Sequence, residues 1–430
     1  MKKLIIVLLQ LCAVVLASQA QQETTAFDAD GIKVIFRPTT KNVINIRLYF
    51  RGGVTNYTAG QAGIENIALD AATKCGTAKY NAAAYRDTSD KYGITSYGAS
   101  ELDFGYIQVN CISKYFDKGW DLFSAAVMDP VFEQNEVKLL KDKAARNIAD
   151  DESDPEAYLD QLQMQNAFAN TPYIINPLGS EESISGLTAD DMKNYYHSIL
   201  NKNKVFIVIV GNVTKQEIFE KVLLSFGNMP SRVYNPVDLK MSPAGDNKVL
   251  IKNKGLKINY VGAVLNSPEF TSLNYVPFRM GISGLSGNIY YNLRTRLHLS
   301  YSAGAGTFQL KAPCTMMYAA TNNVQAAIDE MYRLLKNIKD EGVNDEWLQH
   351  IKNTYLTTSY INDQSASAIT STLGRAEILG GWQYAEDLPK LAQMTTVDQV
   401  NNALNFYLGG MRWTFLGNQE AFEGVTPPAH

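Results

Sequence analysis

The stretch that decides the fold is Val205-Phe206-Ile207-Val208-Ile209-Val210-Gly211-Asn212, six apolar residues in a row closed by Gly-Asn. A short apolar run rich in β-branched residues predicts a buried strand. The same ending returns near the C-terminus, in Arg412-Trp413-Thr414-Phe415-Leu416-Gly417-Asn418. Two closing strands of one kind, roughly 200 residues apart, indicate a fold made of two similar α+β halves.

The beginnings of the two halves also match in pattern. Residues 31–36 and 43–50 open the first half, and residues 248–251 and 256–264 open the second. Each pair is β-rich and is separated by a short turn, so each predicts a β-hairpin. If the halves are duplicates, Val43–Phe50 and Leu256–Val264 should occupy equivalent places.

Helical patterns follow each opening, and a segment rich in Pro and Gly separates the halves. Residues 228–246 contain Pro230, Pro236, Pro243 and Gly245, which is typical of a linker. We therefore predict two domains, residues 21–235 and 236–430, each a mixed or antiparallel sheet backed by helices. The expected helical stretches are 60–74, 133–151, 280–297, 324–338 and 345–360.

Composition excludes several classes of protein. The 430 residues are 46% hydrophobic and 19% charged, with a formal net charge of −4, which is typical of a folded globular chain. No block of Lys or Arg stands out, so nothing in the charge favours nucleic acid or an anionic membrane as a partner.

The N-terminal residues 1–20 have the pattern of a signal peptide. Lys2-Lys3 precedes the apolar run 4–17, and Ser18-Gln19-Ala20 offers a small-x-small cleavage site. The run is shorter than the roughly 20 apolar residues of a membrane span. We therefore expect export to the periplasm or the extracellular space without a membrane anchor.

The predicted mature chain keeps three cysteines, Cys75, Cys111 and Cys314. An odd number allows one disulfide plus a free thiol, or three buried thiols, and the sequence leaves both open.

Several segments resemble the insulinase/pitrilysin-like zinc peptidases, family M16, particularly the short subunits of the processing-peptidase type. In the first half, residues 49–53 and 63–66 resemble the strand and turn that lead to the family's zinc helix. Residues 172–179 with 184–188 resemble its "HPY…P.G…I..LT" stretch, and residues 210–213 its "VVGNV" strand. In the second half, residues 293–302 resemble the family's "LREKRGLAYS" segment.

The zinc signature of active members is missing. Those members carry H-x-x-E-H on the first helix and a Glu ligand on a later helix. Aligned from Gly63, the chain has Asn66, Leu69 and Asp70 at the His, Glu and His positions, and the spacing places Asn147 at the later Glu. No His occurs between Met1 and Tyr196, so a register slip by one residue restores nothing. We predict no metal in this chain, and zinc only in a partner subunit.

The apolar residues of the helix that carries these positions indicate a structural role. Residues Ile64, Ile67, Ala68, Ala71 and Ala72 recur with helical spacing and predict a stripe that packs on the core.

The second half keeps a different pair. The resemblance implies that Arg294 and Tyr301, seven residues apart, line a cleft opposite the zinc of a partner. There Tyr would donate a hydrogen bond to the developing oxyanion, and Arg would orient the substrate backbone. Gly284 and Gly287 match the family's glycine-rich, substrate-binding segment. The structural alternative is a surface Arg in an ion pair and a Tyr packed in the core.

Two functions follow as hypotheses. The first is a zinc-less subunit of a heteromeric metallopeptidase, in which an H-x-x-E-H partner and this chain form a heterodimer that cleaves unstructured peptides. The alternative is a non-enzymatic peptide-binding or scaffold protein on the same bilobed fold.

Overall fold

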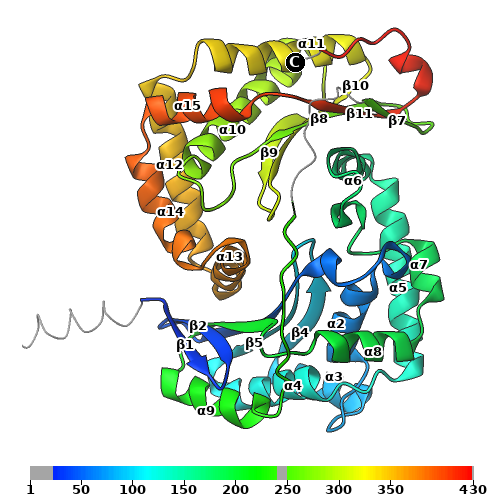
Figure 1. Ribbon diagram of the computed structural model, residues 1–430, viewed down its shortest axis with the longest axis vertical. Coiled ribbons are helices and arrows are strands. Elements are labelled where there is room, and N and C mark those ends of the chain that lie inside the picture. The colour runs from blue at the N-terminus through cyan, green and yellow to red at the C-terminus, as the bar shows by residue number, and fades with distance from the viewer. Residues whose placement is uncertain (1–22, 240–248, 429–430) are drawn as a thin grey trace, which may run out of the picture.

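The two halves each contain one mixed β-sheet in the computed structural model, which describes residues 23–239 and 249–428 (Figure 1). The first sheet has the order β1-β2-β6-β3-β5-β4. Only β2 and β6 pair in parallel, and the other neighbours are antiparallel. Its strands are β1 (Thr25–Ala29), β2 (Ile32–Pro38), β3 (Val43–Arg51), β4 (Thr95–Ser100), β5 (Phe104–Ile112) and β6 (Val205–Gly211).

The second sheet repeats this order from the second strand onward. It runs β7-β11-β8-β10-β9, with β7 and β11 parallel and the other pairs antiparallel. β3 and β8 therefore hold the same position, as expected for duplicated halves. The strands are β7 (Val249–Asn253), β8 (Asn259–Asn266), β9 (Ala303–Phe308), β10 (Cys314–Thr321) and β11 (Arg412–Gly417).

The predicted hairpins are wrong in both halves. β6 lies between β2 and β3, and β11 lies between β7 and β8. The closing strands take the inner places because every residue of β6 and of β11 is buried, and an inner strand hides both faces and both edges. A hairpin does form between β1 and β2, through Asp30 and Gly31, which both adopt positive φ angles.

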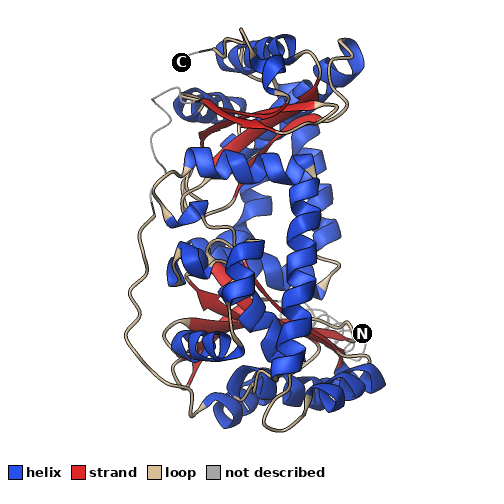
Figure 2. Ribbon diagram, turned by 90° about the vertical axis from the view of Figure 1, so that its right-hand side faces the viewer, coloured by secondary structure: helices blue, strands red, loops and turns tan. Residues whose placement is uncertain are grey.

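The predicted helical stretches are present, with somewhat different ends. Figure 2 shows helices on both sides of each sheet. The first half contains α2 (Ile64–Lys74), α3 (Ala82–Tyr92), α4 (Phe116–Met128), α5 (Gln134–Ser153), α6 (Pro155–Ala167), α7 (Glu181–Gly186), α8 (Ala189–Ile199) and α9 (Lys215–Phe226). The second contains α10 (Tyr275–Tyr290), α11 (Val324–Asp340), α12 (Asp345–Asn362), α13 (Ala366–Leu379), α14 (Gln383–Met394) and α15 (Val397–Tyr407).

The two halves exchange one helix each. On β6, alternate residues face opposite sides, as the pleat requires. Ile207 and Ile209 belong to the first-half core, whereas Phe206 and Val208 pack with Leu373 of α13, which comes from the second half. Figure 1 shows α13 lying above the first sheet, where it contacts β3 and β6.

The reciprocal contact is made by α6, which packs on the second sheet (Figure 1). Leu159 and Leu162 form an apolar cluster with Leu416 of β11. The Asn166 amide donates to the Trp413 carbonyl oxygen at 2.9 Å, and the Arg412 guanidinium donates to the Asn166 carbonyl oxygen at 2.6 Å. Each sheet is therefore completed by the other half.

Both exchanged helices rest against a glycine. A Cβ on Gly374 of α13 would lie 2.0 Å from the ring of Tyr49 on β3, and one on Gly262 of β8 would lie 2.5 Å from the Gln163 side chain on α6. The Tyr49 hydroxyl donates to the Thr370 carbonyl oxygen at 3.0 Å. Larger residues at either glycine would push helix and sheet apart.

Three earlier expectations concern cysteines and the ends of the chain. Cys75, Cys111 and Cys314 are buried and unpaired, which corresponds to the second alternative given above. The predicted signal peptide and part of the linker lie outside the described residues. In the described part of the chain, no helix is both long and apolar enough to cross a membrane.

Candidate functional site

Helix α2 carries the positions that correspond to a zinc site, and its apolar residues pack as predicted. Ile64, Ile67, Ala68, Ala71 and Ala72 are all at most 3% exposed. Leu69 is also fully buried, and its backbone and side chain contact strands β4 and β5 at Gly98 and Gly105.

The other corresponding positions do meet in space. Asn66 and Asp70 of α2 and Asn147 of α5 line one cavity of about 380 Å³ between the two helices. The spacing argument that assigned Asn147 therefore brings it to the same cavity as the α2 residues. Leu69 does not line this cavity.

These side chains do not fit a zinc ion. The Asn66 amide oxygen accepts a hydrogen bond from the Ser100 backbone N–H at 3.1 Å. The Asp70 carboxylate pairs with Lys74 one turn later, at 2.6 Å. Zinc in proteins takes thiolate, imidazole or carboxylate ligands, and of the three corresponding positions only Asp70 offers one, although Asp150 and Asp151 also line the cavity. Within residues 23–239 and 249–428, no three His, Cys, Asp or Glu side chains are grouped closely enough to hold a metal.

A buried carboxyl group beside the cavity was missed from the sequence. Glu65 is 0% exposed and accepts hydrogen bonds from Asn56, Ser100 and Tyr195. Burial raises the pKa of Glu65 above its usual value, and these hydrogen bonds oppose the rise. The helical pattern identifies Glu65 only as a polar residue. Its burial could not be predicted, because its hydrogen-bond partners come from three separate segments.

Arg294 and Tyr301 are brought together in the second half. Arg294 lies in a π-helical turn, Tyr291–Arg296, that continues α10. Its guanidinium donates to the Tyr301 carbonyl oxygen at 3.3 Å and lies 5.2 Å from the centre of the Tyr301 ring and 5.3 Å from that of Tyr290. π-Helical turns occur frequently at functional sites.

The loop after this turn exposes Tyr301. The backbone N–H groups of Leu299 and Ser300 both donate to the Leu293 carbonyl oxygen, and His298 adopts a left-handed φ of 53°. The Tyr301 side chain is 73% exposed. The core-packed alternative for this tyrosine is therefore wrong, and Arg294 has no carboxylate partner within 4.0 Å in the described part of the chain.

The two glycines predicted to bind substrate lie inside α10, within the predicted helical stretch 280–297. A Cβ on Gly284 would overlap the Trp347 ring of α12, so Gly284 permits close packing of the two helices. Gly287 is exposed, with open space where a Cβ would lie. Arg294 and Tyr301 are not among the described residues that line the α2–α5 cavity.

Comparison with known families supports the resemblance seen in the sequence. Residues 33–179 match the family described as Insulinase (Peptidase family M16), and residues 186–355 match the family described as Peptidase M16 inactive domain. The chain belongs to peptidase family M16.

Individual M16 relatives are distant but cover most of the chain. A protein of Helicobacter pylori named "Non-peptidase homolog YmxG" is 22% identical over 83% of this chain and 84% of its own length. A second from the same organism, "Zinc protease PqqE", is 20% identical over 79% and 80%. A solved structure of a protease from Helicobacter pylori superposes with a TM-score of 0.85, at 18% identity, over 92% of this chain and 100% of that one. That likeness shows the two-sheet M16 fold.

Proposed function

We propose that this chain is a non-catalytic M16 subunit. It pairs with a homologous subunit that carries H-x-x-E-H, and it contributes Arg294 and Tyr301 to peptide binding and oxyanion stabilisation. The observation that carries the proposal is the contrast between its two candidate sites. The zinc positions of the first half hold no ligand set, whereas Arg294 and Tyr301 lie together with the tyrosine side chain exposed.

The chemistry of the pair suits a peptide substrate. A phenolic hydroxyl donates one hydrogen bond, and an exposed one is free to reach a carbonyl oxygen as it gains negative charge. The guanidinium beside it supplies further donors and a fixed positive charge for the substrate backbone. Gly287, about two turns before Arg294 along the same helical stretch, leaves room for an approaching main chain.

The related names agree with this assignment. One relative is named a non-peptidase homologue and another a zinc protease, and both are found in the same organism. A pair of this kind is what a zinc-less subunit requires. We also propose, from residues 1–20 alone, that the chain is exported, and from residues 228–246 that its domains meet near residue 235.

The test is complementation. The purified mature chain is mixed with an H-x-x-E-H M16 subunit from the same genome, and cleavage of an unstructured fluorogenic peptide is followed. We expect neither chain alone to match the mixture. Tyr301→Phe should lower kcat of the mixture by on the order of 10²–10³, because one oxyanion donor is lost.

Tyr290→Phe is the matched control. Tyr290 is also exposed and also lies beside the Arg294 guanidinium, and its ring contact survives the change to Phe. This variant should keep the turnover of the wild-type mixture. If the partner is fully active alone, or if Tyr301→Phe behaves like Tyr290→Phe, the scaffold alternative replaces this proposal.

A further inference from the structure

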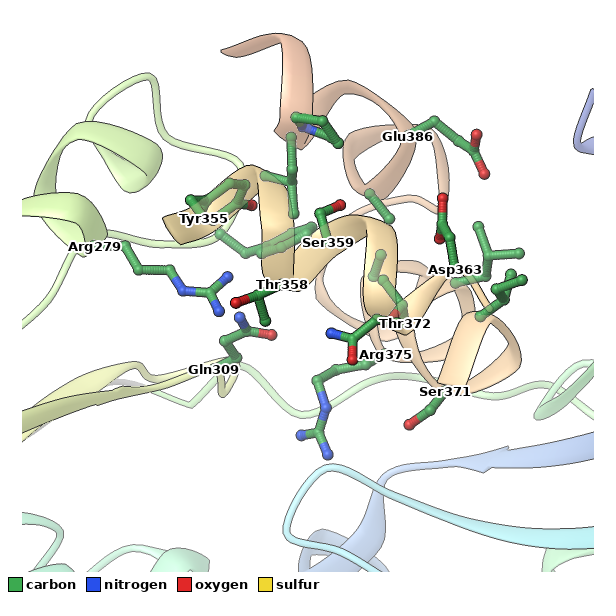
Figure 3. A pocket seen from close by; sticks show the side chains of 18 of the residues that line it. Arg279, Gln309, Tyr355, Thr358, Ser359, Asp363, Ser371, Thr372, Arg375 and Glu386 are labelled. Carbon is green, nitrogen blue, oxygen red and sulfur yellow. The ribbon is translucent and has the colours of Figure 1, made fainter. Parts of the chain in front are cut away.

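A second cavity lies on the inner side of the second half, away from both candidate sites. Its volume is about 460 Å³, and its wall is built by α10, α12, α13 and α14, with Gln309 following β9 and Arg37 from β2 (Figure 3). Neither Arg294 nor Tyr301 is among the described residues that line it. The volume is in the range of small-molecule and peptide-end binding sites, roughly 300–1,000 Å³.

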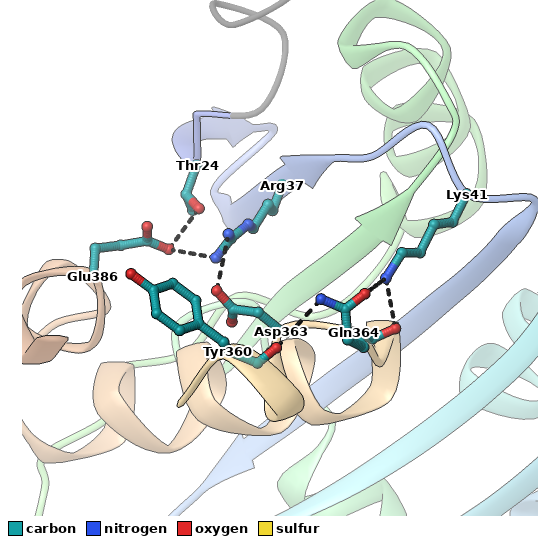
Figure 4. Close-up of polar contacts among 7 residues, drawn as sticks. All are labelled: Thr24, Arg37, Lys41, Tyr360, Asp363, Gln364 and Glu386. Carbon is teal, nitrogen blue, oxygen red and sulfur yellow. Dashed lines mark hydrogen bonds and ion pairs between the residues drawn. The ribbon is translucent and has the colours of Figure 1, made fainter. Parts of the chain in front are cut away.

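One end of the cavity has its charges already paired. Arg37 lies 3.5 Å from the Asp363 carboxylate and 3.4 Å from that of Glu386, and Thr24 donates to Glu386 at 2.7 Å (Figure 4). Nearby, Lys41 donates to the Gln364 carbonyl oxygen at 2.7 Å. The two acidic groups of the lining are therefore held by residues from the first half.

The other end carries Arg279, which lacks such a partner in the described part of the chain, and Arg375. Arg279 has no carboxylate within 4.0 Å among the described residues, and its guanidinium lies 5.7 Å from the centre of the Tyr355 ring. Arg375 pairs with Glu101 at 3.7 Å, slightly farther than Arg37 lies from its two carboxylates. Positive charge is thus left uncompensated at this end.

Neutral hydrogen-bonding groups surround Arg279. Figure 3 shows its side chain extending toward the part of the wall that carries Thr358 and Gln309. Close by, the Tyr275 hydroxyl is buried, and Arg279 is the charged group that acts on it most strongly. Burial raises the pKa of Tyr275 to about 12, and the charges of Arg279 and Arg375 both oppose the rise, so both cations act on this spot.

The rest of the wall is mixed, with an apolar part beside small polar side chains such as Thr354, Ser371 and Thr372. Phe270, Ile351 and Leu388 line the cavity and are nearly buried. An anion without an apolar part, such as phosphate, would leave this wall in contact with water. A carboxylate attached to an apolar side chain would fill both parts, and the planar guanidinium binds a carboxylate through two parallel hydrogen bonds.

We propose that this cavity binds the C-terminal carboxylate of a peptide with an apolar last residue, with Arg279 as its main partner and Arg375 as a second cation. Capture of a chain terminus by preplaced donors is a known mode of peptide recognition. The inference goes beyond the proposed function, because it needs neither a partner subunit nor cleavage.

The test measures binding to the purified mature chain alone. The probe is a fluorescein-labelled hexapeptide that ends in leucine, and its twin has the same sequence with a C-terminal amide. We expect the amide to bind roughly 10- to 100-fold more weakly, because a hydrogen-bonded charge is lost. Arg279→Gln should weaken the free-acid peptide to a similar extent and remove the difference between the twins.

Two controls complete the design. Arg146→Gln removes an exposed arginine of α5, far from this wall, and should change neither affinity. Arg279→Lys keeps the charge but not the two parallel donors, and should lose part of the affinity. Equal binding of the twins, unchanged binding by Arg279→Gln, or displacement of the peptide by millimolar inorganic phosphate would overturn the proposal. Cleavage by the mixed subunits would be unaffected by that outcome.

Discussion

The α2–α5 cavity and the Arg294–Tyr301 pair occupy the two halves of one duplicated fold, and they differ in how their polar groups are used. In the first, Asn66 accepts from a backbone N–H and Asp70 is paired with Lys74. In the second, the Tyr301 side chain is 73% exposed, and the described residues that interact with the guanidinium beside it offer a carbonyl oxygen and two rings.

The polar groups at the zinc-equivalent positions are engaged within the chain, whereas those of the Arg294–Tyr301 pair remain available to a ligand. Polar groups that are satisfied within the chain stabilise the fold and have little left to offer a ligand. Groups that stay exposed and lightly engaged contribute little to stability, so their arrangement is free to serve binding. Three predictions test whether this division holds.

The largest effect should come from rebuilding the metal site. The triple variant Asn66→His, Asp70→His and Asn147→Glu places three zinc-binding side chains around the α2–α5 cavity. We expect about one zinc per chain after dialysis, against well below one for the wild type, by elemental analysis. The double variant without Asn147→Glu should retain less. A triple variant that holds no zinc would show that the assignment of these positions is wrong.

The second prediction concerns Glu65, whose pKa is raised by burial. The folded chain therefore keeps this proton at pH values where a Glu in the unfolded chain, near 4.5, has lost it. Stability should fall as pH rises through this window, with a slope of at most about 1.4 kcal/mol per pH unit. Glu65→Gln, which cannot titrate, should flatten the slope in urea unfolding. Parallel profiles for the two proteins would contradict the assignment.

The smallest expected effect is a difference in unfolding free energy between two alanine variants. Asn66→Ala leaves the buried Ser100 N–H without an acceptor and should cost about 1–3 kcal/mol of unfolding free energy. Arg294→Ala removes only exposed contacts and should cost less than about 1 kcal/mol. Chemical denaturation of both variants measures the contrast. Equal losses would mean that Arg294 has a structural role like that of Asn66.

Local patterns predicted much of this molecule. The run Val205–Val210 is a fully buried strand, and the stripe of Ile64 and Ile67 faces the core. Both predictions succeed because a continuous apolar run and apolar residues at helical spacing indicate burial directly. The loss of the zinc signature can also be identified from the sequence, since no His occurs before Tyr196.

The errors share one physical cause. A hydrophobic pattern indicates that a residue is buried, but it does not indicate which segment of the chain packs against that residue. Strands β2 and β3 looked like a hairpin because they are close in sequence, yet β6 separates them. Glu65 was missed because its hydrogen-bond partners lie elsewhere in the chain. The side-by-side placement of Arg294 and Tyr301 followed from family resemblance, and the exposure of Tyr301 needed the fold.

The exchange of α6 and α13 has a consequence for the order of folding. Tyr49 and Thr370 are 321 positions apart, and Asn166 and Arg412 are 246 apart. Contacts of such long sequence separation slow folding, because a long loop must close before they form. During synthesis, one apolar face of the first sheet stays uncovered until α13 emerges, well after all of its strands have been made. A chaperone that shields this face would have a defined binding surface, and its release would coincide with completion of the second half.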